Sequence, residues 1–318
     1  MIKKLIGNTP IIRIKYKYKN KNREMYAKLE YYNYTGSIKD RIIYHIITKA
    51  KKEKRLKDKQ PIIEATSGNT GISLSAIGAL LGHEVHIFMP DWASRERIEL
   101  KKLYGAKVHL ISKEKGGFQG AIKQADKLVE KINGFRPDQF NNQENIEAHY
   151  LTTGEEIIDK IKNIKIIAYI SGIGTGGTLI GTAKRLKEEN KDIKIIALEP
   201  KNMSLLSKDK KIGSHKIEGI GDDFIPSIVE KNLIDEVITI SDNDALYLSR
   251  LLAKKLGLAV GISSGANFAA SIKSNLDKVV TIFPDDAKKY LSTDLTHEIK
   301  PDTKDLLTDL EIINLEVL

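Results

Sequence analysis

The chain contains three short segments whose residue types could do chemistry together. Residues 34–41 read Tyr-Thr-Gly-Ser-Ile-Lys-Asp-Arg and place Lys39 directly after a Gly-Ser turn, where an amphipathic helix is expected to begin. Residues 66–71 read Thr-Ser-Gly-Asn-Thr-Gly, and residues 172–178 read Gly-Ile-Gly-Thr-Gly-Gly-Thr. A lysine amine can bind a carbonyl cofactor, and glycine-rich turns at helix N-termini bind carboxylates and phosphates through backbone N–H groups. A lysine in a first helical turn is usually a solvated charge, so the prediction depends on the three segments together.

The third segment has two interpretations when it is taken alone. It is expected between a strand and a helix, where backbone N–H groups and the helix dipole converge on one point and suit a phosphate. Gly172, Gly174 and Gly177 also satisfy the spacing G-x-G-x-x-G of a dinucleotide site. Glu199 ends the next expected strand, about where the ribose-binding acid of such a site should stand. An NAD(P)-dependent oxidoreductase is therefore an alternative.

The other two segments favour a cofactor with a single phosphate. A dehydrogenase requires neither the helix start at Lys39 nor an asparagine-containing loop after a separate strand. An aldehyde cofactor requires a lysine for its Schiff base, an anchor for its phosphate and a partner for its ring nitrogen. The sequence therefore predicts a carbonyl cofactor rather than a dinucleotide.

This combination resembles the pyridoxal-phosphate (PLP) enzymes of the cysteine synthase and cystathionine β-synthase family, which have fold type II. The resemblance runs from Ile6-Gly7-Asn8-Thr9-Pro10 to Tyr290-Leu291-Ser292-Thr293. It implies an α/β protein with two doubly wound α/β domains, pyridoxal 5'-phosphate in the cleft between them, and a homodimer. Family members also dock the C-terminal peptide of serine acetyltransferase in this cleft, which makes that peptide a candidate partner.

The resemblance implies a role for residues in each segment. Lys39 forms the Schiff base with PLP and takes the Cα proton as general base. The cofactor phosphate is expected on the loop residues Gly172, Gly174, Thr175, Gly176, Gly177 and Thr178. The substrate carboxylate is expected on Thr66, Ser67, Gly68, Asn69, Thr70 and Gln139, and Asn69 is also expected to reach the ring oxygen of the cofactor.

A further segment matches the family's partner for the ring nitrogen. Residues 261–265 read Gly-Ile-Ser-Ser-Gly, and the resemblance implies that Ser263 is the partner. A hydroxyl cannot hold the pyridine nitrogen protonated as a carboxylate would, so the cofactor is a weaker electron sink. This disfavours transamination and suits the loss of a β-substituent. Ser263 and Ser264 are also expected to cap the helix that follows them.

The implied reaction is β-replacement on an amino acid of the L-serine or L-cysteine type, through an α-aminoacrylate intermediate. The sequence favours cysteine synthase, which converts O-acetyl-L-serine and sulfide to L-cysteine and acetate. The chain departs from the family pattern at residues 219–224, which read Gly-Ile-Gly-Asp-Asp-Phe and border the substrate side chain in the family. Gly219, Asp222 and Asp223 are the substrate-side residues expected in this loop.

The two carboxylates motivate an alternative reaction. A carboxylate at Asp222 or Asp223 would repel an anionic nucleophile such as hydrosulfide, yet could deprotonate water. The alternative is a lyase that expels sulfide from L-cysteine and adds water to give L-serine, or adds a second thiol to give lanthionine or cystathionine. An interpretation without a catalytic role has both carboxylates facing solvent or capping a turn.

Short apolar runs alternate with longer helical segments, which predicts parallel sheets covered by helices. The near alternation of residues 11–32, broken at Lys19-Asn20-Lys21-Asn22, predicts a hairpin. The expected strands are 62–65, 84–89, 108–111, 164–170, 193–198, 237–240 and 279–283. Expected helices begin near 39 and span 69–81, 94–104, 117–132, 178–189, 242–256 and 264–274. The predicted domains are 1–35 (a hairpin packing across to the second domain), 36–146 (the smaller, substrate-loop domain) and 147–318 (the larger, cofactor-phosphate domain).

The composition limits other functions. The chain has no cysteine, so disulfides and thiolate metal sites are excluded, and no metal site is predicted. Hydrophobic residues at 41% and charged residues at 30% are typical of a globular protein. No apolar stretch of signal-peptide type and no run of about 18 apolar residues is present, so the cytoplasm is the expected location and no membrane contact is predicted.

The formal net charge of +10 raises the question of nucleic-acid binding. Residues 1–60 hold 18 Lys and Arg against 5 Asp and Glu. No helix-turn-helix spacing, zinc knuckle or RNP-type strand accompanies them, so a solvated surface that attracts small anions is predicted instead. The tail from Asp294 is acidic, and its apolar residues are expected to pack on their own domain or on a second subunit.

Overall fold

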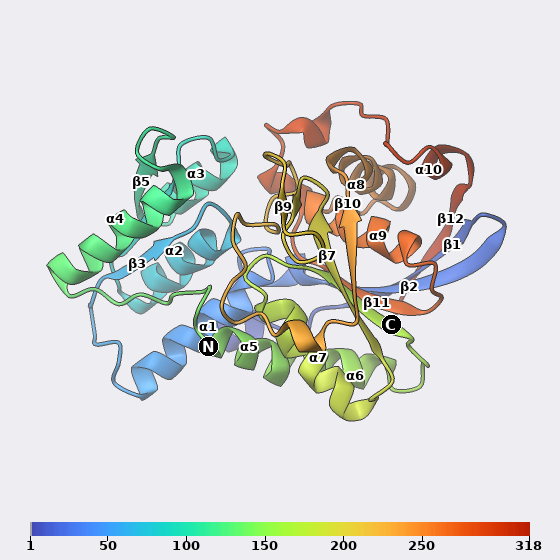
Figure 1. The fold of residues 1–318 in the computed structure, drawn as a ribbon. Coiled ribbons are helices and arrows are strands. Elements are labelled where there is room, and N and C mark those ends of the chain that lie inside the picture. Colours follow the sequence, from blue (N-terminus) through green and yellow to red (C-terminus); the bar gives the residue numbers. More distant parts are fainter. Residues whose placement is uncertain (1) are drawn as a thin grey trace.

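Residues 2–318, which the computed structural model describes, form a seven-stranded sheet, a three-stranded sheet and a two-stranded ribbon (Figure 1). The strands are β1 (Ile11–Tyr18), β2 (Lys21–Leu29), β3 (Ile62–Ala65), β4 (Val85–Pro90), β5 (Lys107–Ile111), β6 (Ala168–Gly172), β7 (Lys194–Pro200), β8 (Met203–Ser204), β9 (Lys210–Lys211), β10 (Glu236–Ile240), β11 (Val279–Phe283) and β12 (Leu310–Val317). The large sheet has the order β10-β7-β6-β11-β2-β1-β12, and the small sheet has the order β3-β4-β5. The fold is therefore α/β with two sheets, as the sequence predicts.

Helices cover both sheets. The α-helices are α1 (Lys39–Lys52), α2 (Asn69–Leu81), α3 (Arg95–Leu103), α4 (Gly117–Ile132), α5 (Glu144–Ala148), α6 (Glu155–Ile161), α7 (Gly177–Glu189), α8 (Asp242–Leu256), α9 (Ile262–Lys273) and α10 (Asp305–Thr308). A π-helix, η3 (His149–Gly154), joins α5 to α6, and the 3-10 helices are η1 (Ile2–Leu5), η2 (Glu30–Tyr32), η4 (Lys231–Leu233), η5 (Ala287–Lys289) and η6 (Asp294–Thr296). Across residues 2–318, none of the helices combines the length and apolar character needed to cross a membrane.

The small sheet is parallel, and its first two strands are buried throughout because helices cover both faces. One face belongs to a core with α1 and α2, formed by Ile42, Ile47, Ile62, Leu74, Ile77 and Ile87. The other face packs against α4 through Ile63, Ala65, Phe88, Ala121 and Ala125. Since β3 ends at Ala65, residues 66–68 and the start of α2 stand at the carboxyl edge of the small sheet.

The central strands β6, β7 and β11 of the large sheet are buried on both faces. Strands β10, β7, β6 and β11 are parallel to one another. Successive side chains of a strand point to opposite faces, so Ile196 and Leu198 join the core beneath α8 and α9 while Ile195 and Ala197 join the core with α6 and α7. Gly172 ends β6 and Phe283 ends β11, which brings residues 172–178 and the segment after Phe283 to one edge of the sheet.

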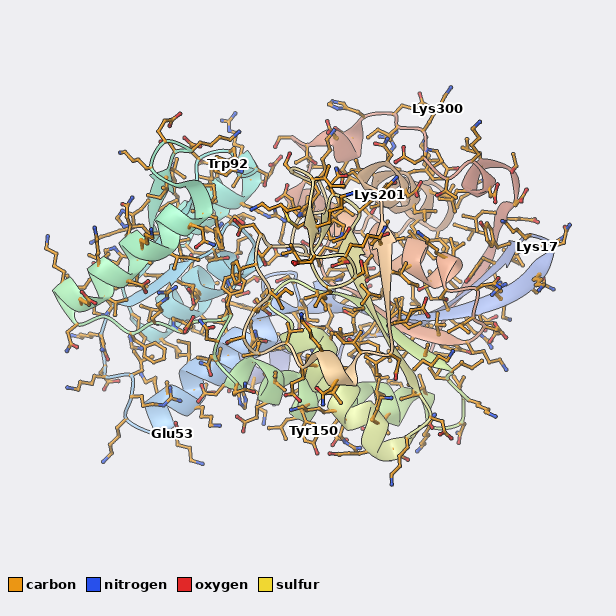
Figure 2. All side chains as sticks on the ribbon, viewed as in Figure 1. Lys17, Glu53, Trp92, Tyr150, Lys201 and Lys300 are labelled. Carbon is orange, nitrogen blue, oxygen red and sulfur yellow. The ribbon has the colours of Figure 1, made fainter. Side chains whose placement is uncertain are left out.

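The N-terminal hairpin extends the large sheet. Its turn has Lys19 at φ 49° and Asn20 at φ 60°, which is the backbone of a two-residue turn that matches the twist of the strands. Strand β2 pairs in parallel with β11, so the hairpin is part of the large sheet. The side chain of Lys17 points outward from the hairpin (Figure 2).

The acidic tail adds the last strand of the large sheet. Strand β12 pairs antiparallel with β1, and Leu310, Ile312 and Leu315 pack against the core of the large sheet. Lys15 forms an ion pair of 2.7 Å with Glu316, so the basic hairpin and the acidic tail compensate each other's charge. In this structure the tail packs on its own chain. The sequence interpretation did not include a strand there.

The structure departs from the predicted elements in two places. The segment between Asn145 and Ile164, to which the sequence interpretation assigned no element, contains η3, α6 and most of α5. The strand predicted to begin at Ile164 begins at Ala168. Residues 164–167 are mostly apolar for reasons other than strand formation. The N–H of Ile164 bonds to the Ile161 carbonyl and closes the turn after α6, and Ile166 packs in the core with α6 and α7.

Candidate active site

The segments predicted to do chemistry meet between the two sheets. Asn69, at the start of α2, donates a hydrogen bond of 2.7 Å to Asp285, which follows β11. The amide of Asn145 donates to Thr175 Oγ1 at 2.9 Å and to the carbonyl of Gln139, also at 2.9 Å. These contacts join the loop after β3, the loop after β6 and the segment after β11 into one site.

Lys39 is the first residue of α1, and the backbone that precedes it is fixed. The N–H of Ile38 bonds to the Pro284 carbonyl at 2.9 Å, and the N–H of Lys39 bonds to Ser37 Oγ at 3.3 Å. Burial lowers the pKa of the Lys39 amine below its ordinary value, while the negative charges of Asp222 and Asp285 raise it partly back. A depressed lysine pKa favours the neutral amine that carbonyl addition and proton abstraction both need.

Residues 174–178 present five consecutive backbone N–H groups, none of which has an acceptor within residues 2–318. They precede and begin α7, so the helix dipole adds to the donors. The loop has no room for side chains, because a Cβ on Gly174 would lie 2.3 Å from the Gly219 carbonyl oxygen and one on Gly177 would lie 1.9 Å from Asn145 Oδ1. Such a cradle fits a phosphate dianion.

The loop after β3 offers a second, smaller set of donors. The N–H groups of Ser67, Asn69 and Thr70 have no acceptor in the described part of the chain, and α2 begins at Asn69. The hydroxyl of Thr70 donates to Gln139 Oε1 at 2.6 Å, which leaves the amide nitrogen of Gln139 as a further donor. Thr66 is held on the sheet by its bond to the Phe88 carbonyl. This set fits a carboxylate.

Comparison with known proteins identifies the family of the chain. Residues 2–285 match the family model described as "Pyridoxal-phosphate dependent enzyme". The chain belongs to that family. The protein is 40% identical to a cysteine synthase of Staphylococcus aureus over 299 residues, which cover 92% of this chain and 96% of the relative.

Solved structures of PLP-family relatives give the same fold. A hydrogen sulfide-producing enzyme from Fusobacterium nucleatum superimposes with a TM-score of 0.96 at 44% identity, covering 100% of this chain and 97% of that one. A cysteine synthase from Entamoeba histolytica superimposes with a TM-score of 0.87 at 38% identity, covering 96% of this chain and 93% of that one. The PLP enzyme has fold type II.

The residues present fit PLP. The five N–H groups of residues 174–178 suit its phosphate. The amine of Lys39, which has no hydrogen-bond partner among residues 2–318, suits its aldehyde. Ser263 lies in the first turn of α9, is buried, and its hydroxyl makes no hydrogen bond to any described residue, so it is free to meet the ring nitrogen. Neither Ser263 nor Ser264 caps α9, since the cap residue is Gly261 and no side chain bonds to the free N–H groups. That part of the prediction was wrong.

The structure separates the two aspartates of the 219–224 loop. Burial raises the pKa of Asp222 to about 6, against the lowering effect of Lys39. Asp222 makes no hydrogen bond or ion pair with the described residues, whereas the exposed Asp223 pairs with Lys211 at 3.2 Å and accepts a bond from Gln119 at 3.3 Å. Gly219, at φ 92°, gives the loop a backbone that other residues rarely adopt. Of these two aspartates, only Asp222 has no partner among residues 2–318, and its charge acts on Lys39.

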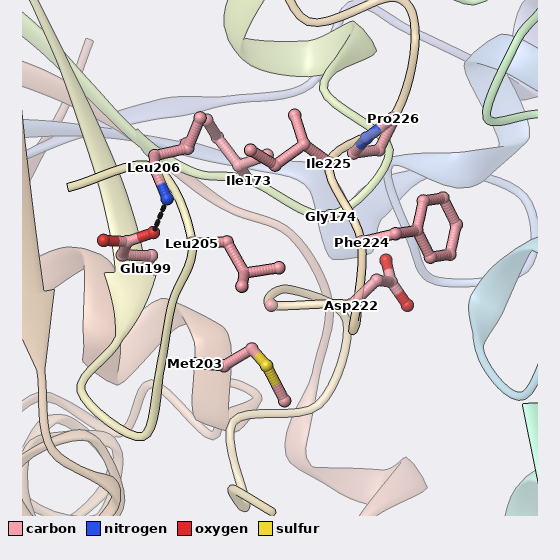
Figure 3. Close-up of a pocket in the computed structure, with 11 residues that line it drawn as sticks. Ile173, Gly174, Glu199, Met203, Leu205, Leu206, Asp222, Phe224, Ile225 and Pro226 are labelled. Atoms are coloured by element: carbon pink, nitrogen blue, oxygen red, sulfur yellow. Dashed lines mark hydrogen bonds between the residues drawn. The ribbon is translucent and has the colours of Figure 1, made fainter. Parts of the chain in front are cut away.

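A small cavity of about 20 Å³ lies behind this loop. Figure 3 shows the segment carrying Asp222 and Phe224 beside Gly174 of the phosphate loop, with Met203 and Leu205 on the facing segment. The residues that line the cavity are mostly apolar. The carboxylate of Glu199 accepts hydrogen bonds from three donors, which belong to Leu206 and Ser207. Glu199 is therefore a structural residue here, which argues against its interpretation as a ribose-binding acid.

Three buried site residues were missed from the sequence. Asn145 and His149 stand beneath the phosphate loop, where His149 Nε2 lies 3.1 Å from Thr178 Oγ1. Burial first, and then the charge of Lys39, lowers the pKa of His149 well below its ordinary value, so the ring is neutral. Both residues belong to the helical segment that was not predicted. The third is Asp285, for which the Pro-Asp-Asp run directly after an expected strand was the available signal.

Proposed function

We propose that this PLP enzyme releases hydrogen sulfide from L-cysteine and adds water at Cβ, so that the products are hydrogen sulfide and L-serine. The proposal is carried by Asp222, a partly buried carboxylate within electrostatic reach of Lys39 and without a partner in residues 2–318. From the sequence alone cysteine synthase was favoured. The surroundings of Asp222 shift the preference to the lyase.

Bound PLP supplies an electron sink that weakens the Cα–H bond and allows the β-substituent to leave. We expect Lys39 to take the Cα proton as a neutral amine and to return it at the end of the reaction. Its lowered pKa favours the neutral form, and the two nearby carboxylates keep that pKa from falling further. The amine therefore stays basic enough to accept a proton.

The substrate is oriented by neutral donors. The N–H groups of Ser67, Asn69 and Thr70 and the amide nitrogen of Gln139 are free to bind its carboxylate. Gln139 is itself fixed, because its N–H bonds to Glu64 Oε2 at 3.4 Å and its carbonyl accepts from Asn145. Preorganised donors of this kind hold an anion without a nearby cation.

Asp222 is proposed as the base for the incoming water. The sulfur leaves as hydrosulfide and keeps its own thiol hydrogen. Asp222 then takes one proton from water as the water oxygen bonds to Cβ, and the other hydrogen of water stays on the new serine hydroxyl. The proton on Asp222 passes to hydrosulfide or solvent, so L-cysteine and water give L-serine and hydrogen sulfide. A pKa of about 6 leaves the carboxylate largely ionised at neutral pH yet more basic than an exposed aspartate. The same negative charge disfavours hydrosulfide as a nucleophile.

Cysteine synthase activity is the second candidate. It is supported by the 40% identity to the Staphylococcus aureus cysteine synthase. In that reaction O-acetyl-L-serine is the substrate and sulfide the nucleophile, so a carboxylate at Asp222 would oppose the approach of the anion. Addition of a second thiol would give lanthionine or cystathionine. That reaction would use the same site but would not need a base to deprotonate water.

The test is an incubation with L-cysteine alone, followed by measurement of sulfide and L-serine. Equal amounts of both are expected. Asp222→Asn should lower L-serine formation by at least about 100-fold, because a general base contributes about 10²–10⁴ in rate. Asp223→Asn is the matched control and should stay within about threefold, because exposed charges contribute little. A parent enzyme that releases no sulfide from L-cysteine, but makes L-cysteine from O-acetyl-L-serine and sulfide, would show that the proposal is wrong.

We also infer from the family resemblance that the enzyme is a homodimer and that the C-terminal peptide of a serine acetyltransferase binds in its cleft. The free donors of the loop after β3 suit the terminal carboxylate of such a peptide. Light scattering would give the oligomeric state. A synthetic peptide should compete with L-cysteine, and a peptide amidated at its C-terminus should not.

A further inference from the structure

Asp285 lies at the meeting point of the segments that carry Lys39, Asn69 and Ser263. Its carbonyl accepts the N–H of Gly261 at 3.0 Å, two residues before Ser263. On the other side, residue 285 forms an isolated bridge with Ser37, two residues before Lys39. The backbone of Asp285 is therefore clamped between the lysine segment and the serine turn.

The side chain of Asp285 is completely buried, and only one of its two carboxylate oxygens accepts hydrogen bonds from the described residues. Its Oδ2 accepts bonds from Asn69 Nδ2 at 2.7 Å and from the hydroxyl of Tyr290 at 2.6 Å. Its Oδ1 is buried without a partner in the described part of the chain, close against Gly261, where a Cβ would come within 2.0 Å. Burial raises the pKa of Tyr290 well above its ordinary value, so that hydroxyl stays protonated and donates.

A buried carboxylate with two neutral donors and a free oxygen is costly to keep in a fold. No cation forms an ion pair with Asp285 among residues 2–318, although Arg97 lies 4.5 Å over the ring of Tyr290. The charge of Asp285 instead acts on Lys39, whose pKa it raises. A buried carboxylate oxygen without a partner is unusual in native folds and points to a role in the site.

Asp285 also fixes the orientation of Asn69. A carboxylate oxygen accepts hydrogen bonds, so the amide nitrogen of Asn69, and not its oxygen, faces Asp285 Oδ2. Asn69 Oδ1 is then turned away and is itself buried without a partner in the described residues. One hydrogen of the amide nitrogen remains for a ligand, and the direction of that hydrogen is set by Asp285.

We propose that Asp285 is a positioning residue of the active site, which holds the Asn69 amide in one orientation and provides a second negative charge near Lys39. The proposal concerns the resting enzyme and is independent of the substrate. The other titratable groups that face Lys39 are Asp222, from the 219–224 loop, and His149, from η3, which is neutral. Asp222 and Asp285 are therefore the two carboxylates that oppose the effect of burial on the pKa of Lys39.

The test uses the absorbance of the bound cofactor as a function of pH, which reports the protonation of the nitrogen that joins it to Lys39. Asp285→Asn keeps the shape of the side chain and removes its charge. It should move the titration midpoint down by at least about one pH unit, because loss of a nearby anion disfavours the protonated form. Tyr290→Phe, which removes one donor and leaves the charge, should move the midpoint much less.

Circular dichroism establishes that each variant is folded, and Asp285→Ser serves as a second neutral variant. A folded Asp285→Asn or Asp285→Ser protein with the parent's midpoint would overturn the proposal. Failure of both neutral variants to fold would overturn it as well, because it would assign Asp285 a structural role alone. No substrate is used, so the result is distinct from any failure of the proposed lyase activity.

Discussion

The guanidinium of Arg97, in α3, forms an ion pair with Glu218, four residues before Asp222. Arg97 is 1% exposed, and two of its nitrogen atoms have no hydrogen-bond partner in the described residues. Helix α3 also contacts the segment after η5 through Glu96, whose carboxylate accepts the N–H of Ser292 at 2.7 Å. The loop that carries Asp222 is thus tied to the helix that follows β4.

Glu218→Gln is expected to destabilise the protein, because it leaves the buried charge of Arg97 without an anion. The glutamate side chain is 31% exposed, so the loss should be about 1–3 kcal/mol rather than the larger cost of breaking a fully buried pair. Urea unfolding measures it. Glu298→Gln, at an exposed position, is the control and should change stability little. Equal stability of both variants would contradict the importance of the pair.

Gly177→Ala should weaken binding of PLP by more than about tenfold, a loss of roughly 1.4 kcal/mol. A Cβ at residue 177 would lie 1.9 Å from Asn145 Oδ1, which would push Asn145 or the loop out of place. Titration of the apo-protein with PLP, followed by absorbance, gives the affinity. Gly213→Ala is the control, since a Cβ there would meet nothing within 4 Å. Unchanged affinity in Gly177→Ala would show that the phosphate lies elsewhere.

Asp222→Asn should make the fold more stable at pH 8 while it removes activity. The folded pKa of Asp222, about 6, lies above the ordinary value of 3.8 that the unfolded chain retains. The folded state therefore holds its proton more tightly, and the cost of ionising the carboxylate appears as pH rises above 3.8 and is complete above about 6. Thermal unfolding at pH 8 should show a higher Tm for the variant, and the difference should shrink near pH 4. A lower Tm at pH 8 would mean that Asp222 is a stabilising residue.

Reduction of the holoenzyme with borohydride should fix the cofactor on Lys39 and on no other lysine. Lys101 is the internal comparison, because burial also lowers its pKa well below the ordinary value, yet its amine is engaged with the Ser67 carbonyl at 3.1 Å. Peptide mass spectrometry identifies the modified residue. Modification at Lys101, or at no lysine, would contradict the assignment.

Much of the fold and the site could be predicted where the signal is local. The Lys39 segment and the two loops after β3 and β6 are each a few consecutive residues long. The glycine spacing, the strand-to-helix order and the family resemblance together could therefore locate them. The hairpin was predicted from alternation and its turn. The domain boundaries and the ligand roles of the individual residues stay predictions.

The residues that were missed depend on long-range contacts. The place of Asn145 and His149 in the site depends on α5 and η3, which pack beneath a loop some thirty residues later in the chain. His149 Nε2 lies 3.1 Å from Thr178 Oγ1 in that loop. Asp285 meets Asn69 across 216 positions of the chain. Strand β12 was missed because it is an edge strand that pairs on one side only. The sequence of such a strand need not contain many buried apolar residues. The difference between Asp222 and Asp223 is likewise invisible in a sequence that shows two adjacent carboxylates.

The most direct test of the account is the origin of the oxygen in the product. The enzyme should be incubated with L-cysteine in water enriched in ¹⁸O, and the L-serine formed should be analysed by mass spectrometry. The account predicts L-serine with ¹⁸O in its side chain, formed together with an equal amount of sulfide and nearly absent with Asp222→Asn. Release of sulfide without labelled L-serine would contradict water addition at this site.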